Sequence, residues 1–280
     1  MAIVTLVVNE SRPRAVELAR EAVSWLGERG HTVRLPKRDA AAAGLADLGT
    51  DGDALVEGTD LVVSFGGDGT MLRGVDMVAK RGTPVLGVNL GRLGYLTDIE
   101  AHAVPEVLER FLAGDYGVEE RTMLEVAVGS EATQLVLNEV VLEKTAPGRT
   151  VHLAVGIGGR SFIRYVADGL IVATATGSTA YSFSAGGPIV SPRQDAVVLT
   201  PVAPHTPFSR SLVLHRDEHV AVEVLDERGA MVSVDGRQLG RLARGDVVTA
   251  AMAPVPARFV TFEARDFYGV LKAKFGLADR

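Results

Sequence analysis

The chain has 280 residues, of which 47% are hydrophobic and 23% are charged, and its formal net charge is −6 at pH 7. This length allows one large or two modest domains, and the negative charge argues against general binding to nucleic acid or to a membrane surface. The absence of cysteine excludes disulfides, thiolate catalysis and cysteine-based zinc sites.

Targeting signals are absent from the sequence pattern. The first residues lack the basic and apolar regions of a secretion signal. No apolar stretch approaches the roughly 20 residues that cross a bilayer. We therefore expect a soluble, cytoplasmic protein whose partners are small molecules rather than nucleic acid or membrane.

The first part of the chain alternates between strand-like and helical patterns. Short β-branched apolar runs predict strands at residues 3–8, 32–35, 61–65 and 84–89. Apolar residues at helical spacing predict helices at residues 12–27, 71–80 and 104–112, while the alanine-rich residues 39–49 fit a helix or a loop. This alternation indicates an α/β domain at residues 1–112 with a parallel, Rossmann-like sheet. Ligands of such sheets bind at the carboxyl ends of the strands.

A glycine-rich turn follows the third predicted strand, with the order Gly66-Gly67-Asp68-Gly69-Thr70, and a helix start comes next. Glycine permits positive φ and lets another molecule approach the backbone closely. The free N–H groups of a helix start attract phosphate. We interpret the turn as a phosphate site at which the Asp68 carboxylate faces the bound group. The alternative is a tight turn in which Asp68 is only a capping residue.

The pattern changes to short β-type runs after residue 112. Turn signals separate these runs, which predict a β-rich domain at residues 113–257 and an α+β protein of two domains. The tail, residues 258–280, has one strand-like piece followed by an amphipathic end. We expect this tail to pack back on the first domain.

Two segments of the β-rich part carry unusual polar residues. Small and hydroxyl side chains dominate residues 174–187, where a ligand could approach the backbone and stack on Tyr181. A Ser/Gly-rich helix start is the alternative. Asn138 and Glu139 interrupt an apolar run and would lie on opposite faces of one strand, so we place them at a strand end or bulge. They suit sugar hydroxyls, but edge-strand polar residues would look the same.

Three ordered segments together resemble the bacterial NAD kinase family. They are GGDGT followed by Met71-Leu72-Arg73, LNEVVLEK, and DGLIVATATGSTAYSFSAGGPIV. Residues 89–96 and 233–236 resemble further segments of that family, whereas GGDGT alone also marks diacylglycerol-kinase-like and phosphofructokinase-like proteins. The resemblance implies an α/β domain, a β-rich NAD-binding domain and a returning tail. It also implies a homodimer or homotetramer with a site partly shared across an interface.

The resemblance implies transfer of the terminal phosphoryl group of ATP, or of polyphosphate in some members, to the 2′-hydroxyl of the adenosine ribose of NAD, which gives NADP. A ribose hydroxyl is a poor nucleophile, so a carboxylate must take its proton, and Asp68 is the expected base. The backbone of Gly66, Gly67, Gly69 and Thr70 would bind phosphate together with a divalent cation, Mg²⁺, held by the donor phosphates. No Walker-type lysine is present, and Arg73 is the nearest cation.

The resemblance also implies a set of dinucleotide contacts. Asn138 and Glu139 would hold ribose and phosphate groups, Asp168 would lie near the nicotinamide, and Tyr181 would stack. The full expected set is Asp68, Gly69, Arg73, Asn138, Glu139, Arg149, Asp168, Thr179, Ala180, Tyr181, Ser182, Phe183, Ser184 and Gln238. One departure from the family pattern is Ala175, which replaces a proline and is expected to loosen the turn without removing a functional group.

Two other functions remain open at this point. One is a related GGDGT kinase that acts on a lipid or a sugar, and the other is a dinucleotide-binding regulator without catalysis. The preferred phosphoryl donor, the acceptance of NADH, allosteric control and the choice between dimer and tetramer also stay open.

Overall fold

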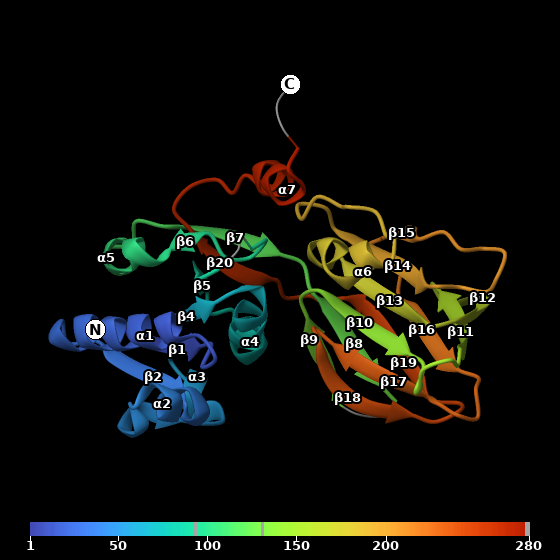
Figure 1. Ribbon diagram of the computed structural model, residues 1–280, viewed down its shortest axis with the longest axis horizontal. Coiled ribbons are helices and arrows are strands. Elements are labelled where there is room, and N and C mark those ends of the chain that lie inside the picture. Colours follow the sequence, from blue (N-terminus) through green and yellow to red (C-terminus); the bar gives the residue numbers. More distant parts are fainter. Residues whose placement is uncertain (92–93, 130–131, 278–280) are drawn as a thin grey trace. The chain divides into compact units, whose positions relative to one another are not determined.

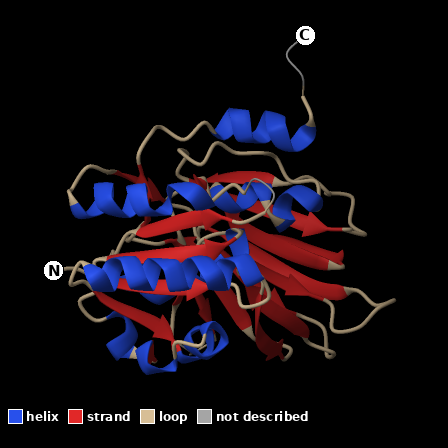
Figure 2. Ribbon diagram, turned by 60° about the vertical axis from the view of Figure 1, so that its left-hand side comes forward, coloured by secondary structure: helices blue, strands red, loops and turns tan. Residues whose placement is uncertain are grey.

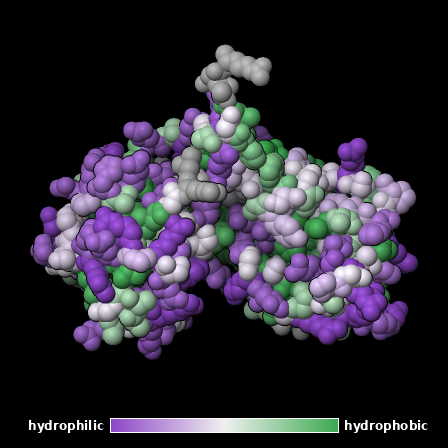
Figure 3. All heavy atoms as spheres, viewed as in Figure 1, coloured by the Kyte–Doolittle hydropathy of each residue, from purple (hydrophilic) through white to green (hydrophobic). Residues whose placement is uncertain are grey.

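The computed structural model describes residues 1–91, 94–129 and 132–277 (Figure 1). The chain divides into two compact units: Met1–Glu120 with Ala257–Arg280, and Arg121–Pro256. Figure 2 distinguishes the elements by type, and Figure 3 shows polar residues spread over the visible face of each unit. In the described part of the chain, no helix is both long and apolar enough to span a membrane.

The first unit is built on an eight-stranded sheet with the order β3-β2-β1-β4-β5-β20-β7, in which β6 pairs with β5. Its strands are β1 Ile3–Val8, β2 Thr32–Pro36, β3 Gly49–Thr50, β4 Leu61–Gly66, β5 Val85–Asn89, β6 Ile99–Glu100, β7 Gly117–Arg121 and β20 Ala257–Thr261. The pairs from β3 through β20, and the β5–β6 pair, are parallel. The predicted α/β domain with a parallel sheet is therefore confirmed.

Helices cover both faces of this sheet. The helices of this unit are α1 Pro13–Glu28, α2 Lys37–Ala43, α3 Asp53–Val56, α4 Asp68–Val78, α5 Val104–Leu112 and, in the tail, α7 Phe267–Phe275, which has no buried residue. The apolar faces of α1 and α5 share one core with alternate residues of β1, β4 and β5. The helix α4 packs on the opposite face, where a Cβ at Gly74 would lie 3.3 Å from both Val62 and Val85. The sheet thus brings the carboxyl ends of β1, β4 and β5 to one edge.

The first unit extends further along the chain than the expected limit at residue 112. It continues through Glu120 because β7 joins its sheet, and it takes back the tail because Phe259 of β20 pairs with Val85 of β5. The strand β7 has the polar sequence GVEER, so a search for apolar runs does not predict it.

The second unit consists of two six-stranded sheets with the orders β15-β14-β13-β10-β17-β18 and β12-β11-β16-β19-β8-β9. All pairs described in them are antiparallel. The strands are β8 Leu124–Val128, β9 Gln134–Val136, β10 Glu139–Glu143, β11 Val151–Ile157, β12 Arg160–Ala167, β13 Gly169–Thr174, β14 Ala196–Val202, β15 Leu212–His215, β16 Val220–Val224, β17 Ala230–Val234, β18 Arg237–Leu242 and β19 Val247–Met252. Inward-facing residues of both sheets form one apolar core. The predicted β-rich domain is confirmed.

Short helical segments interrupt this β-rich unit at one place. A 3₁₀ helix, Thr176–Thr179, runs into the one-turn helix α6, Tyr181–Ser184. Ala185 and Val190, which follow α6, pack against the outer face of the β10–β13–β14 sheet. The polar segment singled out in the sequence is therefore a helical connection between β13 and β14.

Candidate functional site

The turn between β4 and α4 does not use the conformational freedom expected of its glycines. Gly67 is extended, with φ −123° and ψ −166°, and neither Gly66 nor Gly69 adopts positive φ. Gly66 is instead required for space, because a Cβ there would lie 2.1 Å from Thr70 Oγ1. Gly67 and Gly69 have nothing within 4 Å of a Cβ position. Their bare backbone therefore leaves open space at the start of α4, beside N–H groups that a helix cannot satisfy internally.

Asp68 is the first residue of α4, and backbone groups from another loop orient its carboxylate. Its Oδ2 accepts a hydrogen bond from the N–H of Tyr95 at 2.9 Å, and its Oδ1 accepts one from Leu96 at 3.1 Å. A Cβ at Gly94 would lie 2.2 Å from Oδ1, so only glycine allows this approach. Both oxygens keep a lone pair with which to accept a proton. Residues 92 and 93 of the family-like segment 89–96 lie outside the described residues.

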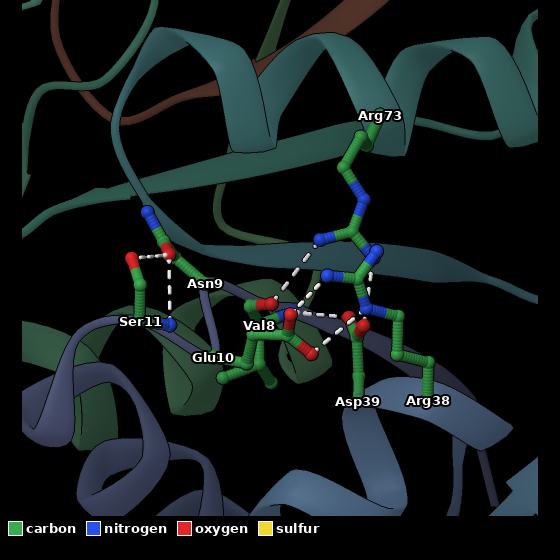
Figure 4. Close-up of polar contacts among 7 residues, drawn as sticks. All are labelled: Val8, Asn9, Glu10, Ser11, Arg38, Asp39 and Arg73. Carbon is green, nitrogen blue, oxygen red and sulfur yellow. Dashed lines mark hydrogen bonds and ion pairs between the residues drawn. The ribbon is translucent and has the colours of Figure 1, made fainter.

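Arg73 does not point toward the glycine-rich turn at which phosphate is expected to bind. Figure 4 shows its guanidinium beside the end of β1, where Nη2 pairs with Asp39 at 2.7 Å and Nη1 donates to the carbonyl of Val8 at 3.2 Å. Asp39 is completely buried and also accepts a hydrogen bond from the Val8 N–H at 2.7 Å. Arg73 thus joins α4 to α2 and β1. The expectation that it serves as the cation for phosphate is not supported by this geometry.

Asn138 and Glu139 lie at a strand end, as the alternation argument predicted. The apolar run that these two residues interrupt is split into β9 and β10, and Glu139 is the first residue of β10. The Asn138 carbonyl accepts a hydrogen bond from Thr174 N–H at 2.9 Å. A Cβ at Gly177 would lie 2.1 Å from that carbonyl oxygen. The strand end is therefore packed directly against the start of the 3₁₀ helix.

The two segments singled out in the second unit meet at Glu139. Its side chain is 6% exposed, and one carboxyl oxygen faces the backbone N–H of Tyr181. The other oxygen, Oε2, has no hydrogen-bond partner among the described residues. Burial, and then the negative charge of Asp235, raise the pKa of Glu139 to about 8, against which the Tyr181 hydrogen bond acts. Glu139 and the Tyr181 backbone thus meet in one polar site, with Asn138 next to Glu139 in the chain.

The residues of α6 divide into outward and inward positions. Tyr181 and Phe183 are 40% and 36% exposed, and Ser184 is also exposed. Ser182, in contrast, is completely buried and shares a hydrogen bond with Thr200 at 2.9 Å. The Ser182 hydroxyl therefore faces the sheet, and a dinucleotide contact at Ser182 stays a prediction that concerns its backbone. Ala175, which replaces the family's proline, keeps φ −59°, an angle that proline also takes.

The remaining expected contacts occupy other places in the second unit. Arg149 and Asp168 line one open pocket of about 460 Å³ together with Lys144, His205 and Arg228. Lys144 pairs with Asp168 at 2.7 Å. Thr179 ends the 3₁₀ helix and donates a hydrogen bond to the Thr176 carbonyl at 3.2 Å, and Ala180 is the next residue. Gln238 lies on β18, where it pairs with Ser233.

Sequence reasoning missed the groups that hold the named residues in place. Asp235 accepts hydrogen bonds from the N–H groups of residues 137–139. An Asp-Gly pair between two strands signals a hairpin turn, but no local pattern shows what its carboxylate contacts. No sequence pattern indicated a role for Lys144 or for Tyr95.

The described side chains do not form a metal site. They include no group of three or more His, Cys, Asp or Glu residues that could hold a metal ion. A divalent cation therefore does not fit a dedicated protein site among these residues.

Comparison with known proteins gives the same order of segments. Residues 4–116 match the ATP-NAD kinase N-terminal domain, and residues 137–262 match the ATP-NAD kinase C-terminal domain. An NAD kinase of Symbiobacterium thermophilum is 44% identical over 275 residues, which cover 96% of this chain and 97% of the relative. An NAD kinase of Heliobacterium modesticaldum is 39% identical over 279 residues, with 98% of both chains covered.

Two solved structures share the fold. Yeast NADH kinase complexed with NADH has a TM-score of 0.91 at 25% identity and covers 100% of this chain and 89% of its own. An NAD kinase from Archaeoglobus fulgidus in complex with ATP has a TM-score of 0.75 at 26% identity, covering 98% and 97%. The ordered motifs, both domain matches and these nearly full-length relatives lead to one conclusion: the chain belongs to the ATP-NAD kinase family.

Proposed function

We propose that this protein transfers the terminal phosphoryl group of ATP to the 2′-hydroxyl of the adenosine ribose of NAD and releases NADP. The observation that carries the proposal is the Asp68 carboxylate, fixed at the start of α4 next to open glycine backbone. The choice of ATP and NAD as the substrates rests on membership of the ATP-NAD kinase family.

In the first unit, Asp68 takes the proton of the ribose hydroxyl as the phosphoryl group arrives. The N–H groups of Tyr95 and Leu96 fix its carboxylate, so little reorganisation is needed. The N–H groups at the start of α4 stabilise phosphate charge. When a divalent cation, Mg²⁺, is bound, it neutralises phosphate charge; we propose that the donor phosphates carry it.

In the second unit, the polar site at Asn138, Glu139 and Tyr181 binds the dinucleotide. The exposed Tyr181 ring offers a face for stacking, and the buried Glu139 lies against the Tyr181 backbone. Arg149 and Asp168, which share a pocket, provide further contacts. By family membership we also propose a homodimer or homotetramer, which light scattering of the purified protein would test.

The central test uses Asp68→Asn with NAD, ATP and Mg²⁺. We expect NAD binding to persist while the rate of NADP formation falls by about 10²–10⁴, the usual contribution of a general base. Because an amide nitrogen would face one backbone N–H, melting and NAD binding are measured in parallel. Asp76→Asn, on an exposed turn of the same helix, serves as the matched control. A near-normal rate in Asp68→Asn would remove Asp68 from the mechanism.

The competing functions give different results in the same assay series. Phosphorylation of diacylglycerol or a sugar, but not of NAD, would favour the related GGDGT kinases. NAD binding without NADP formation in the folded wild-type protein would favour a regulator. A panel of ATP, other nucleoside triphosphates and polyphosphate against NAD and NADH defines the donor and the acceptor.

A further inference from the structure

The returning tail of the first unit contacts the loop that orients Asp68. This loop, residues 94–98, precedes β6, and the backbone N–H groups of Tyr95 and Leu96 within it bind the Asp68 carboxylate. The strand β6 has only two residues, which pair with Val88 and Asn89 of β5. So short a pairing gives the 94–98 loop little support, and side-chain contacts from other elements influence where its N–H groups lie.

Arg265, which follows β20 in the tail, binds the last residue of this loop. Its Nε and Nη2 donate to the two carboxylate oxygens of Asp98 at 2.9 Å and 3.1 Å, a bidentate geometry that suits arginine and not lysine. The Arg265 side chain is only 10% exposed, and its Nε also lies 3.6 Å from Glu119 of β7. Its Cζ lies 5.4 Å from the centroid of the buried Phe259 ring. A guanidinium enclosed in this way has little freedom to move, so it fixes the position of Asp98.

The helix α7 makes a second contact with the 94–98 loop, at Tyr95. The centroids of the Phe267 and Tyr95 rings lie 6.2 Å apart at an interplanar angle of 40°. Near the other end of α7, Lys274 Nζ lies 4.3 Å from the centroid of the Tyr95 ring, which is a cation–π contact. The tail therefore contacts the loop at Tyr95 and at Asp98, three residues apart, and the N–H groups that bind Asp68 belong to this same short stretch.

We propose that Arg265 is a positioning residue for phosphoryl transfer: through its ion pair with Asp98 it keeps the 94–98 loop where the loop N–H groups fix the Asp68 carboxylate. The inference rests on the proposed function, in which Asp68 takes the proton of the ribose hydroxyl. A base acts efficiently only when it is aimed at that proton, and a displacement of about 1 Å costs up to about 10²-fold in rate. The competing explanation is that Leu96 and Thr97, both buried, hold the loop alone and that Arg265 only stabilises the fold.

The first experiment follows the loop without any substrate. Arg265→Met removes the guanidinium and keeps an apolar stem beside Phe259. Hydrogen exchange, measured by mass spectrometry, should become about tenfold faster in peptides that contain residues 94–98 and should change little in β4. Arg258→Met, which removes another ion-paired arginine of the tail, is the matched control and should leave exchange in the loop unchanged. Unchanged exchange of residues 94–98 in Arg265→Met, or an equal acceleration in β4, would overturn the proposal.

The second experiment measures the steady-state kinetics of NADP formation. The kcat of Arg265→Met should fall by about 10- to 100-fold, while KM for NAD and for ATP stays within about threefold, because the base rather than substrate binding is disturbed. Arg258→Met should keep kcat within about twofold of wild type. Asp98→Asn weakens the same ion pair, so the double variant Arg265→Met/Asp98→Asn should lose no more activity than Arg265→Met alone. A near-normal kcat in folded Arg265→Met, or losses that multiply in the double variant, would overturn the proposal.

A variant without the base distinguishes positioning from general destabilisation. Asp68→Ala removes the carboxylate without placing an amide nitrogen against the loop N–H groups. In this background Arg265→Met should cause no further loss of kcat, because no base is left to misplace. An equal fold-loss in both backgrounds would show a structural effect only and refute the inference. If the wild-type protein forms no NADP, the proposed function fails, whereas hydrogen exchange of residues 94–98 still decides whether Arg265 holds the loop.

Discussion

The three glycines of the GGDGT turn should respond very differently to alanine. A Cβ at Gly66 would lie 2.1 Å from Thr70 Oγ1, 2.7 Å from Thr70 Cβ and 3.2 Å from Asn9 Cβ. Rotation of the Thr70 hydroxyl would relieve only the first contact, so the start of α4 must move. Overpacking of this kind costs about 1–3 kcal/mol, and we expect Gly66→Ala to reach the upper end.

Gly67 and Gly69 provide matched controls within the same turn, since both have open space at the Cβ position. Gly69 lies inside α4 without positive φ, so Gly69→Ala should stabilise the fold by about 0.5–1 kcal/mol through backbone entropy. Gly67 is the N-cap, where alanine is less favourable than glycine, and Gly67→Ala should cost at most about 1 kcal/mol.

The assay uses the single tryptophan of the chain. Trp25 lies on α1 of the first unit, so its fluorescence during urea unfolding reports on the unit that contains the turn. A Gly66→Ala protein within about 0.5 kcal/mol of wild type would refute the steric argument. If Gly67→Ala and Gly69→Ala fold normally but lose activity, the added methyl groups block the approach of phosphate to the backbone. Normal activity in both would refute the phosphate interpretation of the turn.

Three further predictions concern stability. Asp39→Ala should lower the free energy of unfolding by about 2–4 kcal/mol, because it leaves the buried Val8 N–H without its acceptor and Arg73 without its ion pair. Urea unfolding followed by Trp25 fluorescence tests this. A loss below about 1 kcal/mol would contradict it. Tyr165→Phe should raise the melting temperature or leave it unchanged, because the Tyr165 hydroxyl is buried without a partner among the described residues. A marked fall would reveal a partner. The proton on Glu139 stabilises the fold fully below pH 4.5, and this stabilisation disappears as pH rises through about 8. Unfolding free energies of wild type minus Glu139→Gln should therefore decrease by about 1.4 kcal/mol per pH unit across that window, and a constant difference would contradict the raised pKa.

The types of the elements could be predicted because they depend on local periodicity. Apolar spacing placed α5 at residues 104–112 and β1 at 3–8, which are the bounds in the structure. Strands without an apolar period, such as β18 with the sequence RQLGRL, were not predicted, since cross-strand pairing rather than composition selects them.

The family, the order of the segments and the position of the GGDGT turn follow from the amino-acid order alone. What each side chain contacts depends on how the chain packs. Arg73 follows the turn closely, yet it pairs with Asp39, and Asp235 reaches the N–H of Asn138 across 97 positions. Ser182 faces Thr200 rather than the exposed side of its helix. Local patterns constrain the backbone over a few residues, whereas hydrogen bonds and charge states depend on which distant groups the packed sheets bring within about 3 Å.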